Sequence, residues 1–295
     1  MSRAGQITAQ AAAGSRGRLE IVATPIGNLA DISSRARESL AHADVIAAED
    51  TRHTRQLLSA LGISGELRSL HAHNETGRID ELLQLLEAGK SIALVSDAGT
   101  PLLSDPGFAL LRAAIAHGIE VRAVPGASAL TAAISIAGLP VDRFAFEGFL
   151  PARSGERRER LAQLTRETRT LIFFEAPHRI AATLEELASM FGRERPAVIA
   201  RELTKLHETV YRGALGELAE RAQSDVDMSR GEITLLVAGA SSAAAAEGDA
   251  QLLARALKLL LAELPPARAA AIAAQLAGVS RSEAYALAQR LRAGS

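Results

Sequence analysis

Short runs of apolar residues alternate with helical periodicity along most of the chain, beginning at residue 19. The spacing i, i+3, i+4, i+7, which marks one face of an amphipathic helix, is met by Ile79, Leu82, Leu83 and Leu86. The short runs have the length of buried strands, and such alternation predicts an α/β fold with largely parallel sheets. The predicted strands are 19–23, 44–48, 92–96, 119–124, 144–149, 170–174, 197–201 and 233–238.

Breaks in this pattern predict how the chain is divided. Residues 1–17 lack the apolar block of a secretory signal, so we expect a disordered cytoplasmic tail there. Proline and glycine gather at 125–140, which indicates a domain boundary, and the Ser/Ala/Gly/Asp stretch 240–249 is typical of a linker. The predicted parts are a tail over 1–17, α/β domains over 18–128 and 129–241, and a helical module over 250–295.

The last part of the chain is predicted to form three helices, over 250–263, 267–276 and 280–292. Gly278 lies in the turn between the last two, and Ser280 is placed to cap the third, a spacing that fits a helix-turn-helix. Residues 250–295 carry six basic and two acidic side chains. This positive excess favours contact with nucleic acid, and a solvated helical pair is the alternative.

The composition excludes several kinds of site. The chain has no cysteine, which rules out a disulfide scaffold, a thiolate zinc site, an iron–sulfur cluster and a catalytic cysteine. No apolar run approaches the roughly 20 residues that span a bilayer, so we expect no membrane contact and a cytoplasmic protein. The net charge is -1, which means that any nucleic acid must be bound through local basic patches.

Glycine spacing excludes the common nucleotide-binding loops. No two of the 23 glycines are separated by a single residue, so the G-x-G-x-x-G fingerprint is absent. A P-loop and a G-x-S-x-G elbow are absent as well. Polar residues nevertheless follow many predicted strands, where open α/β sheets bind ligands. One of these segments runs into Asp105-Pro106, which predicts a helix with Asp105 as its N-cap.

Seven polar segments of this kind point to a large cleft between two sheets, although each alone is compatible with ordinary turn chemistry. They are 23–29, 48–54, 71–75, 95–107, 124–129, 173–179 and 201–205. In the third, His71, His73 and Glu75 share one face of an extended chain and could form a metal triad. Nothing else in the sequence supports a metal, so we predict none and favour substrate contact or a buried polar network.

Together these segments resemble the tetrapyrrole methylase superfamily, in the branch that modifies ribosomal RNA. The matching motifs are, in chain order, Thr24-Pro25-Ile26-Gly27-Asn28-Leu29, Glu49-Asp50-Thr51-Arg52-His53-Thr54, His73-Asn74-Glu75, Ser96-Asp97-Ala98-Gly99-Thr100-Pro101, Val124-Pro125-Gly126, Glu175-Ala176-Pro177-His178-Arg179 and Arg201-Glu202-Leu203-Thr204-Lys205. The resemblance covers about 19–240 and the C-terminal helices. Glu20 departs from it, because an aromatic residue is usual at that position.

The resemblance implies two α/β domains with the cofactor cleft between them, a C-terminal helical module and a homodimer. It implies S-adenosylmethionine as the cofactor and 16S rRNA of the small ribosomal subunit as the partner. The implied reaction is transfer of a methyl group to the ribose 2′-oxygen of a cytidine in the decoding region.

Residue roles are carried over from the same resemblance. The methionine portion of the cofactor would be held by Asp97, Gly99 and Thr100, and Ser128 and Ala129 would add backbone and hydroxyl contacts. The adenosine portion would be lined by Ile26, Phe174 and Leu203, with Gly231 and Glu232 as further cofactor candidates. The RNA substrate would be contacted by Arg52, His53, His73, Asn74 and Arg179.

A ribose hydroxyl is a weak acid, so its methylation needs a base or a nearby positive charge. The candidate catalytic residues are Lys205, Glu75 and Asp50. Lys205 would either stabilise the developing alkoxide or act as a base if it is buried and neutral. The alternative is that all three residues only position RNA.

Arginine is concentrated in residues 151–170, which carry six arginines and three glutamates. Because RNA binding needs cationic surface, Arg157 and Arg158 are candidate RNA contacts, and a solvated amphipathic helix is the alternative. Two other functions remain open at this point. One is methylation of a corrinoid or porphyrin precursor, and the other is RNA binding without catalysis.

Overall fold

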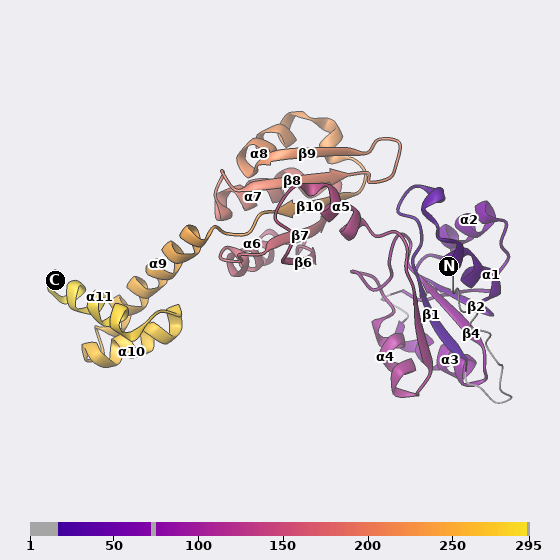
Figure 1. Cartoon of the computed structure of the whole chain (residues 1–295), viewed down its shortest axis with the longest axis horizontal. Helices are drawn as coiled ribbons and strands as arrows, with labels where there is room; N and C mark the ends of the chain where they lie inside the picture. The colour runs from indigo at the N-terminus through magenta and orange to yellow at the C-terminus, as the bar shows by residue number, and fades with distance from the viewer. Residues whose placement is uncertain (1–16, 72–74, 294–295) are drawn as a thin grey trace, which may run out of the picture. The chain divides into compact units, whose positions relative to one another are not determined.

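The structure is a computed structural model that describes residues 17–71 and 75–293, without the side chains of 75–76, 242–249, 251 and 293. Contacts divide the described chain into two units (Figure 1). Unit 1 runs to Ile136 and also contains Ala200–Thr209. Unit 2 comprises Ala137–Ile199 and the chain from Val210 onward. The predicted boundary after residue 128 stays a prediction, beside a contact-based division after Ile136.

Unit 1 is built on a parallel five-stranded sheet with the order β3-β2-β4-β1-β5. Its strands are β1 (Arg18–Val22), β2 (Val45–Ala48), β3 (Leu67–Ser69), β4 (Ser91–Val95) and β5 (Glu120–Val124). The connections contain α1 (Ser34–His42), α2 (Thr51–Leu61), α3 (Glu75–Glu87) and α4 (Phe108–Ala116), with the short 3₁₀ helix η1 (Leu29–Asp31) after β1.

Helices cover both faces of this sheet. Side chains alternate along each strand, so each strand contributes apolar side chains to both faces. In β2, Val45 and Ala47 belong to the core that includes residues of α3 and α4. Ile46 and Ala48, pointing the other way, belong to the core that includes residues of α1 and α2. The nearly continuous apolar runs seen in the sequence are therefore strands buried on both faces.

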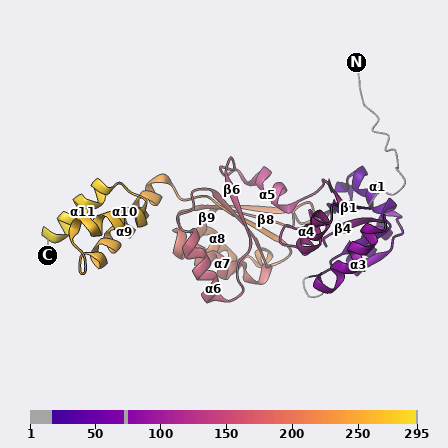
Figure 2. The same ribbon diagram turned by 90° about the horizontal axis from the view of Figure 1, so that it is seen from below.

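Unit 2 contains a second five-stranded sheet, with the order β6-β7-β10-β8-β9. Its strands are β6 (Phe144–Phe149), β7 (Thr170–Glu175), β8 (Pro196–Arg201), β9 (Thr209–Ala214) and β10 (Ile233–Val237). β6 pairs with β7 in parallel, whereas β10 pairs with β7 in antiparallel, so this sheet is mixed. Figure 2 shows the same elements from below.

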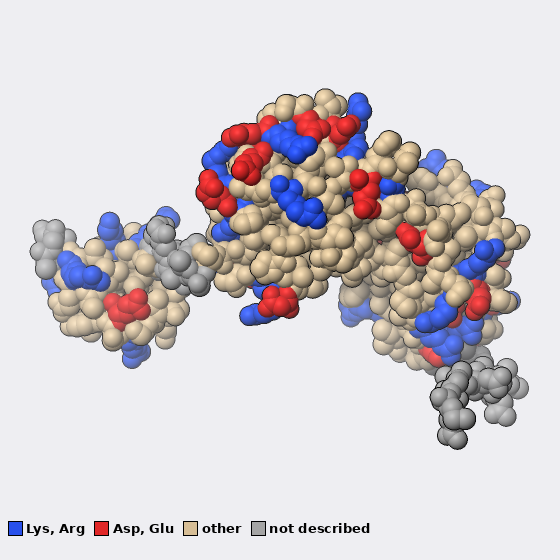
Figure 3. All heavy atoms as spheres, turned by 45° about the horizontal axis from the view of Figure 1, so that its top comes forward, with Lys and Arg blue, Asp and Glu red and all other residues tan. Residues whose placement is uncertain are grey.

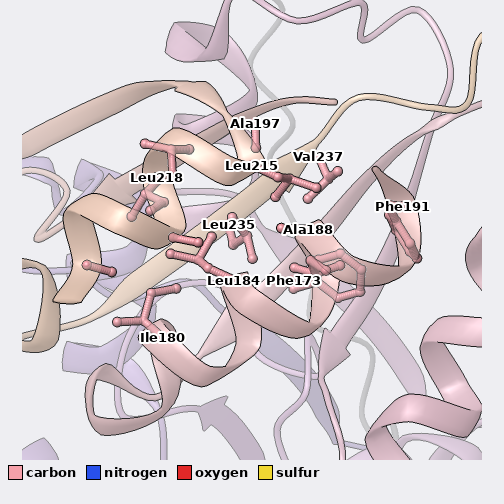
Figure 4. Packing of buried hydrophobic residues seen from close by; sticks show 14 of the residues in the cluster. Phe173, Ile180, Leu184, Ala188, Phe191, Ala197, Leu215, Leu218, Leu235 and Val237 are labelled. Atoms are coloured by element: carbon pink, nitrogen blue, oxygen red, sulfur yellow. The ribbon is translucent and has the colours of Figure 1, made fainter. Parts of the chain in front are cut away.

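The core of unit 2 lies between its sheet and three helices, α6 (Ser154–Leu164), α7 (Ile180–Phe191) and α8 (Leu215–Ser224). Figure 4 shows Leu184 and Ala188 of α7 beside Phe173 and Leu235 of the sheet. The remaining elements are α5 (Ala129–Ala137), η2 (Pro177–Arg179) and η3 (Val226–Ser229).

The C-terminal residues form α9 (Ser242–Leu260), α10 (Pro266–Ala277) and α11 (Arg281–Ala293), which share a core of their own. The predicted turn is confirmed, since Gly278 has φ +68° and the amide of Glu283 donates to Ser280 Oγ at 3.2 Å. The predicted linker at 240–249 is wrong from Ser242 onward, because those residues begin α9. Four consecutive alanines, 243–246, favour this helix.

All eight predicted strands are present, and the amphipathic segment that includes Ile79 is α3. The Asp105-Pro106 helix start is wrong: α4 begins at Phe108, after Gly107 with φ +111°. The carboxyl group of Asp105 is instead hydrogen-bonded to the side chain of Ser96 at the end of β4. Among the described residues, no helix is both long and apolar enough to cross a membrane.

Candidate active site

The strands of unit 1 are parallel, so the loops that follow them begin at one edge of the sheet. Five of the seven polar segments predicted from the sequence start at this edge, after β1, β2, β3, β4 and β5. The segment 201–205 belongs to unit 1 as well, because Ala200–Thr209 packs with it. The segment 173–179 lies in unit 2. Most of the predicted chemistry is thus gathered in one unit.

The loops after β1, β4 and β5 are tied together through their backbones. The backbones of Thr24 and Gly99 exchange two hydrogen bonds, with nitrogen-to-oxygen distances of 2.9 and 3.1 Å. Gly99 has φ +82°, and a β-carbon there would lie 3.1 Å from Ile26 Cγ2 and 3.9 Å from Ser128 Cα. The hydroxyl of Thr100 donates to the Ala127 carbonyl at 3.1 Å. Four predicted cofactor residues, Ile26, Gly99, Thr100 and Ser128, therefore lie close together.

The carboxylate of Asp97 joins the loop after β4 to the loop after β2. One oxygen accepts the Asp50 backbone N–H at 3.0 Å, and the other lies 3.4 Å from His53 Nδ1. The Asp97 side chain remains 39% exposed, which leaves part of its negative charge available to a ligand. Asp97 is thus both a link between loops and a candidate contact for a cationic group.

Asp50 is the N-cap of α2 and accepts the Arg52 backbone N–H at 2.8 Å. Its carboxylate also pairs with the Arg52 guanidinium at 3.0 Å. The hydrogen bond from the Arg52 side chain lowers the pKa of Asp50 to about 2. A carboxylate of this acidity is a weak proton acceptor at neutral pH, so its surroundings suit positioning better than proton removal.

Two acidic residues at this edge, Glu49 and Asp105, were not among the predicted site residues, although they lie in the polar segments 48–54 and 95–107. Burial raises the pKa of Glu49, and the nearby negative charge of Asp97 raises it further. Burial also raises the pKa of Asp105 to about 6, against the opposing effect of its hydrogen bond with Ser96. Carboxyl groups with perturbed pKa values mark candidate functional sites.

Backbone strain is concentrated in two of the loops. Among the described residues, the non-glycine positions with positive φ are Leu102, Ser104, Glu202 and Thr204, at 74°, 74°, 53° and 65°. Such conformations cost about 1–3 kcal/mol each and cluster at functional sites. Thr204 also has a buried Oγ1 that makes no hydrogen bond to any described residue. The positive φ values single out the loop after β4 and the segment 201–208, and the Thr204 hydroxyl singles out the second of these.

Lys205 lies in this strained segment, with Nζ 2.8 Å from Glu202 Oε1. The neighbouring Arg201 is buried and donates to the His207 carbonyl at 3.0 Å. Leu203 is buried, whereas Leu206 is 92% exposed. The segment therefore presents a paired lysine between one buried and one exposed leucine.

Several predicted site residues are placed elsewhere. His73 and Asn74 lie outside the described residues, and Glu75 begins α3 with its side chain undescribed. Phe174, Arg179, Arg157 and Arg158 lie in unit 2, as do the exposed Gly231 and Glu232 that precede β10. Their roles in cofactor or RNA binding stay predictions.

In unit 2, the half-buried ring of Phe174 packs edge-on against Phe146 at 4.9 Å and lies 5.7 Å from Phe149. The guanidinium of Arg179 pairs with the buried Glu175, 3.2 Å away, and donates to the Leu150 carbonyl. These contacts indicate structural roles for Phe174 and Arg179. A ligand could contact only the part of each side chain that remains exposed.

The two adjacent candidate arginines of α6 differ. Arg157 is buried and forms two hydrogen bonds with the Glu186 carboxylate, at 2.7 and 2.9 Å. Arg158 is 66% exposed and lies 3.7 Å from the same carboxylate. Figure 3 shows basic and acidic side chains interspersed over unit 2, without a continuous basic field on the face in view. Of the two, Arg158 has the guanidinium that RNA can reach.

Comparison with known families defines the class of protein to which this fold belongs. The family model of the tetrapyrrole (corrin/porphyrin) methylases matches residues 18–219. The model described as the RsmI C-terminal HTH domain matches residues 244–292. Uroporphyrin-III C-methyl transferase from Thermus thermophilus, in its complex with S-adenyl homocysteine, has the same fold, with a TM-score of 0.54 and 21% identity over 75% of this chain and 97% of that one.

Much closer relatives share nearly the whole chain. The ribosomal RNA small subunit methyltransferase I of Xylella fastidiosa strain Temecula1 is 53% identical over 91% of this chain and 98% of its own. The proteins of the same name from Pseudomonas aeruginosa and Escherichia coli O157:H7 are 50% and 49% identical, over 92% and 94% of this chain and 96% of their own. The chain belongs to the ribosomal RNA small subunit methyltransferase I family, within the tetrapyrrole methylases. The resemblance drawn from the seven motifs is confirmed.

Methyltransferases of this class use S-adenosylmethionine, and the residues of unit 1 fit that group. The positive φ of Gly99 brings its backbone against Ile26, where a larger residue would be strained. Asp97 offers a partly exposed carboxylate, which suits the ammonium of an amino acid. Thr204 supplies a buried hydroxyl without a partner among the described residues. A site formed mainly by backbone atoms, with a few placed polar groups, suits S-adenosylmethionine.

Proposed function

We propose that this protein methylates the ribose 2′-oxygen of a cytidine in the decoding region of 16S rRNA, with S-adenosylmethionine as the donor. The observation that carries the proposal is the similarity, over almost the full length, to relatives named as small-subunit ribosomal RNA methyltransferases. The separate C-terminal helix-turn-helix supports it, because uroporphyrin-type enzymes of the same fold match only 75% of the chain. We place the activity in the cytoplasm and in a homodimer.

We assign the cofactor to the strand edge of unit 1, held by Asp97, Gly99 and Thr100, with Ile26, Ser128, Ala129 and Leu203 around it. S-adenosylmethionine, when bound, supplies a methyl group activated by a positively charged sulfur. The protein then has to hold the acceptor hydroxyl in line with that group, exclude water and favour loss of the hydroxyl proton. Lys205, in the same unit, is the polar group we assign to the acceptor oxygen.

RNA must be held by cationic side chains that reach its phosphates. The exposed Arg52 and His53 stand beside Asp97 at the strand edge. Arg158 on α6 and the basic residues of the C-terminal helices extend the candidate surface. The mild overall charge favours an assembled small subunit as substrate, since structured RNA and protein can provide shape recognition that charge alone does not.

The test is to incubate the protein with labelled S-adenosylmethionine and, separately, small ribosomal subunits, free 16S rRNA and uroporphyrinogen. We expect label in the RNA of the subunits, and a 2′-O-methyl cytidine that disappears from cells lacking the protein. Label in the tetrapyrrole alone would establish the alternative methylase activity. RNA binding without uptake of the cofactor would reduce the protein to a non-catalytic binder.

A further inference from the structure

The side chain of Lys205 lies directly against the backbone of Gly27. A β-carbon on residue 27 would overlap Lys205 Cγ and come within 3.0 Å of Cε and 3.1 Å of Cδ. Gly27 also has φ +154°, which disfavours any residue with a side chain. Only glycine leaves room for the aliphatic part of the Lys205 side chain at this position of the loop after β1.

The other end of the lysine is held by Glu202, three residues earlier. Lys205 Nζ donates to Glu202 Oε1 at 2.8 Å, and the two side chains are only 25% and 17% exposed. Glu202 adopts φ +53° to make this contact, a strained conformation for glutamate. A carboxylate at hydrogen-bonding distance favours the charged form of an amine.

The other charged groups of the segment are engaged in different contacts. The Glu208 carboxylate accepts the Thr204 N–H at 2.5 Å, and Arg201 donates to the His207 carbonyl. The loop 24–29 on the opposite side of Lys205 contains no ionisable side chain. Among the contacts that the structure describes, Glu202 is the acidic group paired with the lysine.

We propose that Gly27 and Glu202 are positioning residues that hold Lys205 as a cation, so that Lys205 stabilises negative charge on the acceptor oxygen and does not remove its proton. The proposal rests on the methylation of a ribose hydroxyl put forward above. Lys205 keeps its three protons and donates a hydrogen bond to the acceptor oxygen while the O–CH3 bond forms and the S–CH3 bond of the donor breaks. The proton of the acceptor hydroxyl is released to bulk solvent outside the site. Of the two roles the sequence left open for Lys205, this selects the cation.

Two substitutions of the lysine separate these roles. Arginine stays charged and cannot serve as a base, whereas methionine has a similar stem without charge. We expect K205M to lower kcat by about 10²–10³-fold, the usual loss of one donor to a developing oxyanion. K205R should retain measurably more turnover than K205M. Equal inactivity of the two variants, with the cofactor still bound, would overturn the cationic role.

The positioning residues are tested without turnover, by reaction of the amines with acetic anhydride at a series of pH values. The chain has three lysines, so mass spectrometry can follow Lys205 separately from Lys90 and Lys258. In Glu202→Gln, Lys205 should react at lower pH than in the wild type, because the carboxylate no longer favours the ammonium. Lys90, paired with Asp44 at 3.0 Å, is the internal control and should react unchanged.

Glu202→Gln and Gly27→Ala should also lower kcat by about 10- to 100-fold, the cost of a misplaced catalytic group. For Glu202→Gln, the affinity for S-adenosylmethionine in calorimetry and the melting temperature should stay near wild type, which separates misplacement from misfolding. Gly27→Ala should lower the melting temperature, because alanine is strained at that φ and its β-carbon overlaps Lys205. An unchanged labelling profile in Glu202→Gln, with unchanged kcat, would overturn the proposal. If the wild type methylates no ribosomal RNA, the proposed function fails, while labelling still reports whether Lys205 is held as a cation.

Discussion

Three carboxyl groups near the strand edge of unit 1 are held in different electrostatic surroundings. Hydrogen bonding to Arg52 lowers the pKa of Asp50 to about 2, and burial raises that of Asp105 to about 6. The pKa of Glu49 is raised by burial and by Asp97. At mildly acidic pH the edge can therefore hold an ionised Asp50, paired with Arg52, and a neutral Asp105.

The Asp105 carboxyl should make the protein less stable as pH rises. Its folded-state pKa of about 6 lies above the ordinary aspartate value of 3.8, so the folded state binds more protons between these two pH values. The free energy of unfolding consequently falls as pH rises from about 4 to about 6. We expect Asp105→Asn to remove this loss and to stabilise the protein by about 1–3 kcal/mol at pH 7.5 and by little at pH 4.

Denaturant unfolding at the two pH values measures this difference. Asp142→Asn, at an exposed position, is the matched control and should leave the free energy of unfolding unchanged at both. A wild type and an Asp105→Asn variant with the same difference in stability at pH 4 and pH 7.5 would show that Asp105 titrates normally.

The sequence identified several of these residues but not their surroundings. Asp97 and Gly99 could be named because the motif that contains them resembles one of the tetrapyrrole methylase superfamily. The burial of Asp105 could not be predicted, because it depends on how the loop folds back toward Ser96. Arg157 was read as surface for the same reason: its partner Glu186 is 29 residues away and on another helix.

Helix α6 carries two neighbouring arginines with opposite expected effects. Arg157 satisfies the half-buried Glu186 and also donates to the carbonyls of Pro151 and Ala152. Burial is the largest single influence on the pKa of Glu186 and raises it, but the hydrogen bonds from Arg157 and Ser154 and the charges of Arg157 and Arg158 together lower the pKa overall. Removing one partner of such a pair leaves an uncompensated charge.

We therefore expect Arg157→Ala to destabilise the protein by about 3–5 kcal/mol. Arg158→Ala should change stability by no more than about 0.5 kcal/mol, and should weaken binding to small ribosomal subunits. Chemical denaturation and a filter-binding assay measure the two effects. Loss of RNA affinity in a fully stable Arg157→Ala protein would assign that residue to the RNA surface after all.

The elements that the sequence predicted best are those buried on both faces. Central strands such as β4 are continuous apolar runs and could be identified directly. The two strands that were missed, β3 and β9, lie at the edges of their sheets and are only partly buried. The small residues of 240–249 predict a linker, but most of this stretch belongs to α9, because its alanines favour helix.

The chain as a whole contains separate hydrophobic cores. Unit 1 has one on each face of its sheet, unit 2 has one between its sheet and α6–α8, and the C-terminal helices have one built largely from alanine. Alanine lets helix backbones approach closely, so α9, α10 and α11 depend on each other. Any truncation has to remove the three helices together.

A chain that ends at Ala240 removes them completely, whereas an end at residue 249 would cut α9 in two. The shortened protein should bind small ribosomal subunits about tenfold more weakly at low salt, with a shallower dependence on salt, because fewer phosphates are neutralised. Its affinity for S-adenosylmethionine should not change. RNA affinity equal to that of the full chain at several salt concentrations would exclude the C-terminal helices from the RNA surface.

Unit 1 is formed by two separate stretches of the chain, so it cannot be completed during translation until the second stretch has been synthesised. Its last piece, Ala200–Thr209, is synthesised only after β6, β7 and most of β8 of the second sheet. A nascent chain of 136 residues can form every strand of the first sheet, yet it lacks Lys205. Incomplete products released by early termination would thus carry most of the proposed donor site without the lysine, so the proposed catalysis requires chains synthesised beyond β6, β7 and β8 of the second sheet.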